Sequence, residues 1–303
     1  MTALSLCGCA ALGSTWLQWA ESRLHPHGLA ISLRPDFGGR GITTLRARAA
    51  GEVLASVSNT EVLTASRLLS RGGRLKSITE AAASIGSPFT ETQVLVLFLL
   101  SSRSRLRDLI GPDVSHELRY VEGLPEEQPT AIHLVAERAL LPRCYAAVSD
   151  AAVCHLRAQH LATCTALAAA GVEDISLSES DFAWAFSHVR ARSIQIPSEE
   201  GTAAAPLAGR DAGKERALFP ILDLFNHRPC ARASLIRQRE AKRSGRVVQW
   251  SLISNDTYGA GHAFGWVAHP TTPALIVYLM PSQSAADTSQ GIRSLSTMVS
   301  ATT

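Results

Sequence analysis

The sequence predicts an α+β fold in which a unit of short, curved sheets is interrupted by a helical insertion. Three observations support this expectation: strand-like segments occupy both ends of the chain, helical patterns fill its middle, and the chain has 303 residues. At about 100–200 residues per domain, that length suits two domains or one domain with a large insertion. A composition of 46% hydrophobic and 18% charged residues is typical of a globular protein with a sizeable core.

The first part of the predicted β unit covers residues 16–90. Strand-like sequences occur at 28–33 and 52–57, and closely spaced glycines between them indicate turns. These short segments predict small sheets.

The helical insertion is predicted over residues 91–180. The segment 92–107 begins almost wholly apolar and ends basic, as expected of a partly buried helix. A second, Ala-rich helix is expected at 145–171, with Gly171 as its stop signal. Its predicted buried face consists of Tyr145, Val148, Ala152, Leu156, Leu161, Cys164 and Leu167.

The second part of the β unit is predicted over residues 181–264. Ser178, with Asp181 three residues later, signals the start of a helix that leads into it. A loop without periodicity follows at 198–216. Strand-like sequences then appear at 217–225 and 247–254, and the tail at 265–303 is atypical.

Charge and hydropathy exclude several classes of partner. A net charge of +3 provides no electrostatic footprint for nucleic acid. The basic stretch at 237–246 is compatible with a nucleic-acid or nuclear-import signal, but we interpret it as a solvated hairpin loop. The longest apolar runs, at 94–100 and 274–280, are far shorter than the roughly 20 residues of a membrane-spanning helix. We therefore expect neither a nucleic-acid partner nor a membrane partner.

The six cysteines indicate a reducing compartment. No two of them form a Cys-x-x-Cys pair, and no His-x-x-x-His pair lies near enough to complete a zinc site, so no metal site is predicted. Cys144, Cys154 and Cys164 are spaced by ten residues, which we interpret as buried, reduced cysteines on a helix. The N-terminus lacks the basic start of a signal peptide. These features predict an intracellular protein, with the cytoplasm as the first expectation and the nucleus or plastid as alternatives.

The most informative motif is FPILDLFNHRP at 219–229. Asp223, Asn226 and His227 place a carboxylate, an amide and an imidazole together at the end of an apolar run. By spacing alone, a simple turn that closes a strand explains these residues as well as a functional site does.

This motif resembles the Asn-His signature of SET-domain methyltransferases, in the branch of the Rubisco large-subunit lysine methyltransferases and the actin-histidine methyltransferases. Further segments are similar to the same branch, in the same order, and together with the motif they cover about residues 16–264. These segments are WLQWAE (16–21) with the Gly-rich stretch 37–64, RYVEGLP at the start of 119–141, DFAWAFSHVRARSIQIPSEEG (181–201) and WSLISNDTYGAGHAF (250–264).

The resemblance implies a SET-type fold, S-adenosyl-L-methionine as the cofactor, and a protein as the substrate. Methyl transfer by in-line displacement depends mostly on alignment of donor and acceptor. Matched residue by residue, the family's cofactor contacts fall on Gly38, Gly39, Arg40 (backbone only), Gly41, Arg192, Asp223, Leu224, Phe225, Asn226 and His227. Two alternatives stay open: the glycines form an ordinary tight turn, and Arg192 is a structural ion-pair partner of Asp223.

The sequence departs from the family after its Ala-Gly turn. The family continues with a Tyr-Gly strand whose tyrosine lines the methyl-transfer channel, but here the turn is followed by HAFGWVAHPTTP at 262–273. Tyr258 and Gly259 precede the turn, so we interpret them as a strand end. No catalytic residue is therefore assigned, and the expectation is a SET-type unit truncated at its C-terminal end.

Substrate choice depends on one position. Ile194, placed as a substrate-binding residue, resembles the apolar channel walls of the lysine-directed enzymes. The adjoining Gln-Ile-Pro-Ser-Glu stretch is similar to the histidine-directed enzymes. We predict a methyltransferase acting on lysine of a non-histone protein. A histidine N-methyltransferase and a catalytically dead SET-like protein-binding module are the alternatives.

Overall fold

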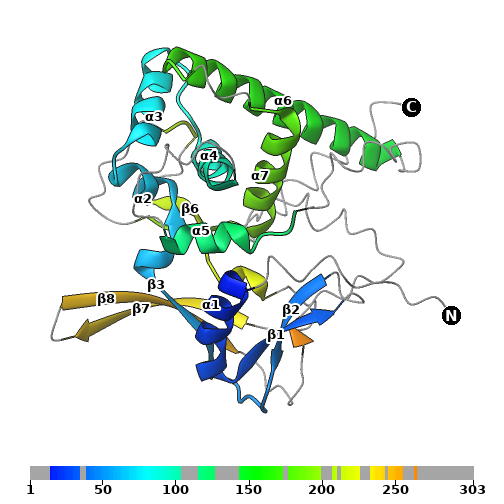
Figure 1. Cartoon of the computed structure of the whole chain (residues 1–303), viewed down its shortest axis with the longest axis vertical. Helices are drawn as coiled ribbons and strands as arrows, with labels where there is room; N and C mark the ends of the chain where they lie inside the picture. Colours follow the sequence, from blue (N-terminus) through cyan, green and yellow to red (C-terminus); the bar gives the residue numbers. More distant parts are fainter. Residues whose placement is uncertain are drawn as a thin grey trace, which may run out of the picture.

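The computed structural model divides the chain into a helical lobe and a sheet lobe (Figure 1). It describes residues 14–34, 39–103, 115–126, 143–172, 177–198, 207–209, 213–225, 233–242, 245–254 and 263–264. Most helices gather in the first lobe, whereas α1 (Ser14–Leu24) lies with the sheets in the second. The fold is therefore α+β, as predicted.

The strands of the described residues form three small antiparallel sheets. The first contains β1 (Leu29–Arg34), β2 (Gly39–Thr44) and β9 (Ala263–Phe264), with β2 in the middle. The second has β8 (Gly245–Ser254) between β3 (Val53–Ser58) and β7 (Ala233–Lys242). The third has β6 (Lys214–Leu218) between β4 (Leu63–Thr64) and β5 (Ile194–Pro197).

The helical lobe is built around α4 (Glu91–Arg103), which lies at its centre (Figure 1). Residues 94–100 of α4 are all buried, as expected when a helix is apolar on every side. The surrounding helices are α2 (Ala65–Ser70), α3 (Arg74–Ser84), α5 (Ser115–Glu122), α6 (Arg143–Ala169) and α7 (Glu179–Arg192).

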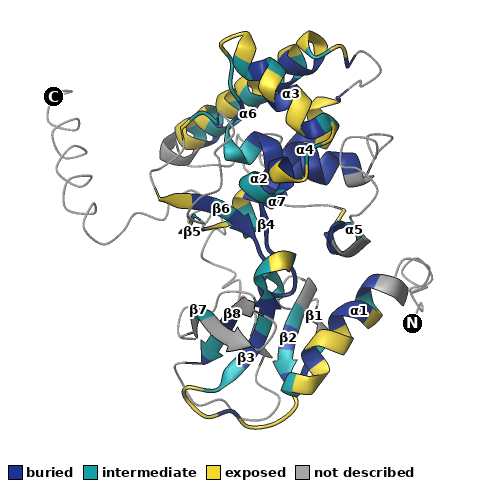
Figure 2. Cartoon of the chain, turned by 90° about the vertical axis from the view of Figure 1, so that its left-hand side faces the viewer, coloured by how far each residue is buried: buried dark blue, intermediate teal, exposed yellow. Residues whose placement is uncertain are grey.

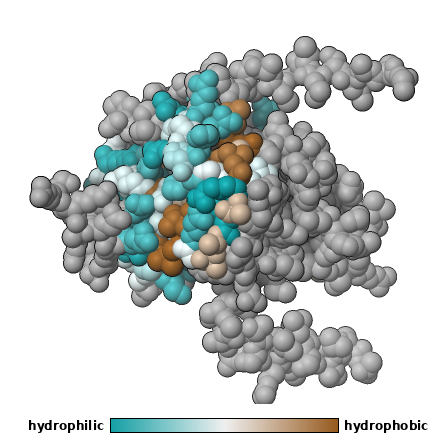
Figure 3. Space-filling model, turned by 90° about the horizontal axis from the view of Figure 1, so that it is seen from below, coloured by the Kyte–Doolittle hydropathy of each residue, from teal (hydrophilic) through white to brown (hydrophobic). Residues whose placement is uncertain are grey.

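The sheet lobe has its own core, which is rich in tryptophan. Trp16, Trp19 and Trp250 are buried there together with Ile42 from β2. The rings of Phe219 and Trp250 meet edge to face, with their centroids 5.3 Å apart. Seen from below, this lobe carries small groups of hydrophobic residues among hydrophilic ones (Figure 3).

The third sheet lies between the two cores (Figure 2). Leu63 and Leu218 belong to the helical core, whereas Ile196 and Ala217 belong to the sheet core. Successive residues of a strand point to opposite faces, so one thin sheet contributes side chains to both lobes.

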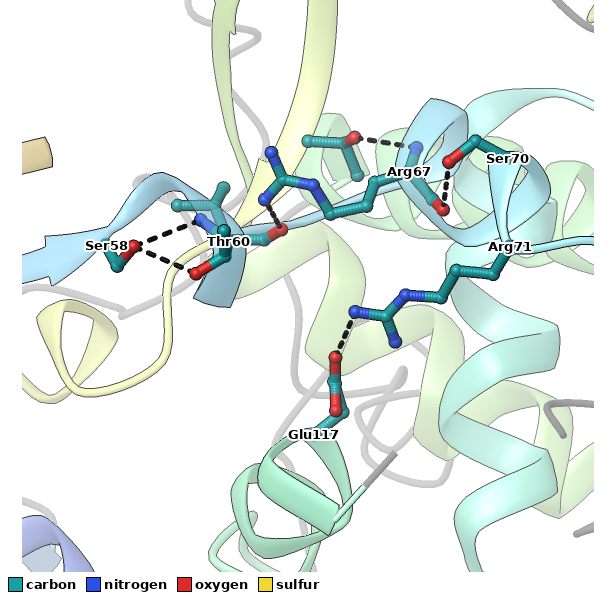
Figure 4. A network of polar contacts seen from close by, with 8 residues as sticks. Ser58, Thr60, Arg67, Ser70, Arg71 and Glu117 are labelled. Carbon is teal, nitrogen blue, oxygen red and sulfur yellow. Dashed lines mark hydrogen bonds and ion pairs between the residues drawn. The ribbon is translucent and has the colours of Figure 1, made fainter. Parts of the chain in front are cut away.

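Helix α5 also connects the lobes, through polar and apolar contacts. Arg71, at the end of α2, pairs with Glu117 of α5 (Figure 4). Arg67 of α2 donates to the carbonyl of Val62, the residue before β4, at 2.8 Å. After α5, Gly123 lies directly against the indole of Trp16, and a Cβ at this glycine would be 2.0 Å from the indole nitrogen.

Several predicted elements are confirmed. The strand predicted at 28–33 is β1, the one at 52–57 is β3, and the apolar helix of the insertion is α4. The Ser178 cap is present, because its Oγ accepts a hydrogen bond from the Asp181 N–H at 3.0 Å. Helices also occupy residues 65–70 and 74–84, where none was predicted, whereas the domain boundary at residue 90 stays a prediction.

The predicted strand at 217–225 is wrong beyond Leu218. The chain leaves β6 there and forms a turn followed by a 3-10 helix at Leu222–Leu224. Pro220 has no N–H for a strand ladder, and its carbonyl instead accepts from the N–H of Leu222 at 2.9 Å.

The predicted loop at 237–246 is also wrong, because most of it belongs to strands. Arg237 lies opposite Trp250, and Lys242 lies opposite Gly245, so β7 and β8 form one long antiparallel pair. The high density of charged residues at 237–246 led to the prediction of a loop. Charged side chains also suit the solvent-facing side of a hairpin strand, so the same residues are compatible with the strands that form.

The predicted buried face of α6 is only partly correct. Leu156 and Leu167 are buried, but Val148 is 43% exposed and Leu161 is 68% exposed. Ser149, Thr163 and Ala166 are buried instead. The hydroxyl of Thr163 donates to the carbonyl of Gln159 at 2.7 Å, so small polar residues fit this face without an unsatisfied group.

The expectation of buried helix cysteines is wrong for Cys154, which is exposed, whereas Cys164 is half-buried. Ten residues at 3.6 per turn leave successive positions about 80° apart around the helix axis, so these positions do not share one face. Burial raises the pKa of the Cys164 thiol above its usual value.

Candidate functional site

The candidate site forms where α5, α7 and the 3-10 helix at Leu222–Leu224 meet. Ile221, just before this helix, has φ 72° and is the only residue other than glycine with positive φ in the described part of the chain. A β-branched residue in this region is strained, at a cost of about 1–3 kcal/mol. This backbone conformation starts the turn that presents Asp223.

The carboxylate of Asp223 is buried and has two partners. Its Oδ2 accepts a hydrogen bond from the hydroxyl of Tyr120 at 2.9 Å and pairs with Nη1 of Arg192 at 3.1 Å. Only 4% of the Asp223 side chain is exposed, against 18% of the Arg192 side chain. The cation balances the buried negative charge.

His188 lies one turn before Arg192 on α7 and orients the Arg192 guanidinium. Nε of Arg192 donates to Nδ1 of His188 at 3.2 Å, and Nε2 of His188 lies 3.0 Å from the carbonyl of Pro125. Because the guanidinium only donates, Nδ1 accepts and the proton sits on Nε2, which makes His188 neutral in this arrangement. Trp184 donates to the same Pro125 carbonyl at 2.9 Å.

Residues 120–125 therefore contact this network at two places. Tyr120 contacts Asp223, and Pro125 contacts His188 and Trp184. Burial, and next the charge of Asp223, raise the pKa of Tyr120 well above its usual range. The phenol remains protonated and serves as a hydrogen-bond donor, not as a base.

The predicted glycine contacts lie on the strand beside this network. Gly39 and Gly41 share one face of β2, opposite to the buried side chain of Ile42, and β2 contacts the 3-10 helix at Leu222–Leu224. Arg40 contributes its backbone to β2. Gly38, Asn226 and His227 lie outside the described residues.

The remaining predicted residues flank the network. Leu224 and Phe225 are half-buried and pack against the core of the sheet lobe. Ile194 is 41% exposed on β5, an edge strand, two residues after Arg192. A role in cofactor or substrate contact stays a prediction for all of these residues.

The sequence interpretation missed Tyr120, Trp184 and His188. Tyr120 belongs to the RYVEGLP segment, and Trp184 and His188 belong to the 181–201 segment. Both segments resemble the family, but no role was predicted for these three side chains. The structure contains the ion pair between Arg192 and Asp223, which the sequence had offered as the alternative for Arg192.

Other kinds of site are not found in the described residues. No group of three or more His, Cys, Asp or Glu side chains is arranged there to hold a metal ion. None of the helices there has the combined length and apolar character needed to cross a bilayer.

Comparison with known proteins relates this geometry to solved structures. No family model and no curated protein matches the sequence. The structure is similar to the SET domain of LSMT bound to lysine and AdoHcy, with a TM-score of 0.61 and 15% sequence identity over 87% of this chain and 56% of that one. It is also similar to Rubisco LSMT bound to AdoMet, with a TM-score of 0.58 and 15% identity over 90% of this chain and 57% of that one.

The chain thus spans a little over half the length of these structures. At this level of identity the similarity concerns the fold. The chain has the SET-type fold of the Rubisco LSMT structures.

Proposed function

We propose that this chain is an S-adenosyl-L-methionine-dependent protein methyltransferase that acts on a lysine side chain of a non-histone protein. The observation that carries the proposal is the similarity of fold, over 87% of the chain, to a SET domain bound to lysine and AdoHcy. Two of the residues that resemble the family's cofactor contacts, Arg192 and Asp223, form an ion pair in this fold.

The described residues fit this cofactor. Bound S-adenosyl-L-methionine supplies a methyl group activated by its sulfonium. Arg192 is partly exposed and is held by Asp223 and His188, so its guanidinium can bind the carboxylate at the methionine end. Gly39 and Gly41 remove side chains from one face of β2, which lets a ligand approach the backbone.

The remaining proposed contacts complete the same site. In the sequence, Gly38 directly precedes β2 and Arg40 lies between Gly39 and Gly41, while Leu224, Phe225, Asn226 and His227 directly follow Asp223. Ile194 provides an apolar wall for the substrate side chain, on the strand that follows Arg192. In this arrangement the chain binds and orients the cofactor and the substrate side chain, and it excludes water from them. No side chain is assigned to proton transfer.

Cofactor binding is the first test. Isothermal titration of the chain with S-adenosyl-L-methionine should give saturable binding, and Arg192→Gln should weaken it about ten-fold, the effect of losing one charge-assisted contact. Arg157→Gln is the matched control, because Arg157 of α6 forms an exposed ion pair with Glu179 of α7 and its loss should leave the affinity unchanged. No heat from the parent chain at millimolar cofactor would refute the proposal.

Methyl transfer is the second test. The chain is incubated with a cell lysate and S-adenosyl-L-methionine labelled on its methyl group, and the labelled amino acid is identified after hydrolysis. Methyllysine is the expected product. Methylhistidine would assign the chain to the histidine-directed alternative, and cofactor binding without any labelled protein would favour the non-catalytic binding module.

A further inference from the structure

A cavity separate from the candidate site lies in the helical lobe, beside the third sheet. Its volume is about 190 Å³, and α4, α6, α7, β5 and β6 all contribute to its walls. Gln195 and Arg216 line it and lie opposite each other in the β5–β6 register. Ile194 pairs with Ala217 in the same register, so both point to the other face of the sheet. The cavity and the predicted substrate residue are therefore on opposite faces.

The cavity is rich in positive charge. Arg190, Lys214 and Arg216 line it, whereas Glu91 is the only acidic residue among the described lining residues. Glu91 is engaged, because its Oε2 accepts a hydrogen bond from the backbone N–H of Arg216 at 2.8 Å. The three cations thus exceed the negative charge at the cavity wall.

The cations also have donors to spare. In the described part of the chain, Arg190 and Lys214 take part in no ion pair or side-chain hydrogen bond, and Arg216 uses Nη1 to reach the Ser193 hydroxyl at 2.9 Å. The pKa of the Arg216 guanidinium is lowered, first by burial and then by the charge of Arg190. Two cations that repel each other across a cavity favour an anion between them.

The start of α4 adds to this potential. Thr90 caps the helix, since its Oγ1 accepts from the N–H of Gln93 at 3.2 Å, and Thr90, Glu91 and Thr92 all line the cavity. A helix of 13 residues carries a partial positive charge at this end. The helix terminus and the three cationic side chains therefore act on the same space.

We propose that this cavity binds a phosphate-type oxyanion. The chemistry is that of a tetrahedral anion held by two guanidinium groups, an ammonium group and the hydroxyl of Thr92. The anion is either a free phosphate ion or the phosphate of a phosphorylated side chain on a protein, and these sources share one site. The site is independent of the proposed methyltransferase activity.

Titration of the full chain with inorganic phosphate at low ionic strength tests the proposal. Saturable binding is expected, and Arg190→Gln or Lys214→Gln should each weaken it about ten-fold. Lys76→Gln is the matched control: it removes the same charge from α3, outside the cavity, and should have no effect. The proposal would be overturned if the chain bound no phosphate at concentrations about ten-fold above the millimolar range. It would also be overturned if Lys76→Gln weakened phosphate binding as much as the cavity variants do.

A change of opposite sign sharpens the test. Glu91→Gln removes the acidic group while its amide oxygen can still accept from the Arg216 N–H, so phosphate affinity should rise several-fold. Unchanged or weaker affinity would contradict the proposed electrostatics. Competition with a phosphoserine peptide and its unphosphorylated form then separates the sources: displacement by the phosphopeptide alone indicates a protein-borne phosphate, and displacement by neither indicates the free ion.

Discussion

The helical lobe and the sheet lobe are stabilised in different ways. The helical core contains continuous buried segments, such as residues 94–100 of α4 and 182–189 of α7. The sheet core instead collects single residues from distant parts of the chain, from Trp16 to Trp250. The first core can form largely from neighbouring segments, whereas the second requires residues as far apart in the chain as Trp16 and Trp250 to meet.

The polar groups follow the same division. Several buried hydroxyls of the helical lobe donate within their own helix: Thr79 donates to the carbonyl of Leu75 at 2.9 Å, and Ser101 donates to that of Phe98 at 2.7 Å. Between the lobes, the contacts join remote residues, as Tyr120 does with Asp223. The candidate site is therefore built from long-range contacts where the two cores meet.

The largest effect is expected from the centre of the helical lobe. Phe98→Ala should lower the free energy of unfolding by about 3–5 kcal/mol, because the ring is fully buried and leaves a cavity. Chemical denaturation measures this change. Leu161→Ala, at a position 68% exposed on α6, is the control and should change stability by less than about 0.5 kcal/mol. Equal effects at the two positions would contradict the described core.

Breaking the ion pair between the lobes should come next. Asp223→Ala leaves the Arg192 guanidinium without its carboxylate and should cost about 3 kcal/mol. Glu179→Ala removes one partner of an exposed pair and should cost less than about 1 kcal/mol. Denaturation curves of the two variants give the comparison, and a loss at Asp223 no greater than at Glu179 would show that the buried network is not stabilising.

A smaller effect is expected where α1 packs against the end of α5. Gly123→Ala places a methyl group into the buried indole of Trp16, so one side must shift, at a cost of about 1–3 kcal/mol. Thermal unfolding measures the loss. Gly72→Ala provides a contrast, because a Cβ there meets no atom within 4 Å and any penalty comes from its positive φ alone.

The smallest effect concerns pH in the sheet lobe. Partial burial, and next the charge of Arg48, lower the pKa of His27 below its ordinary value of 6.5. The folded state then binds this proton less readily than the unfolded state, so the stability contribution is complete above pH 6.5 and declines as the pH falls through the folded pKa. His27→Gln should reduce the loss of Tm between pH 7.5 and 5.5, by on the order of 1 °C. An unchanged pH profile would contradict this role.

The sequence by itself determined most of the local structure, because local structure depends on neighbouring residues. Apolar runs predicted α4, the Ser178 cap predicted the start of α7, and glycine spacing predicted short strands near the N-terminus. The residue motif around Asp223 also indicated where a site would form, and the SET-type fold was expected from the order of such motifs.

Only the tertiary structure decided how these parts meet. Tyr120 and Asp223 are 103 residues apart in the chain, and neither residue type specifies the other as its partner. The positive φ of Ile221 replaces a predicted strand with a turn, because the packing around the buried Ile221 holds the backbone there. The cationic cavity arises in the same way, since residues of α4, α7 and β6 share a wall only when the helices have packed against the third sheet. Long-range contacts have no local sequence signal, and for this reason they required the structure.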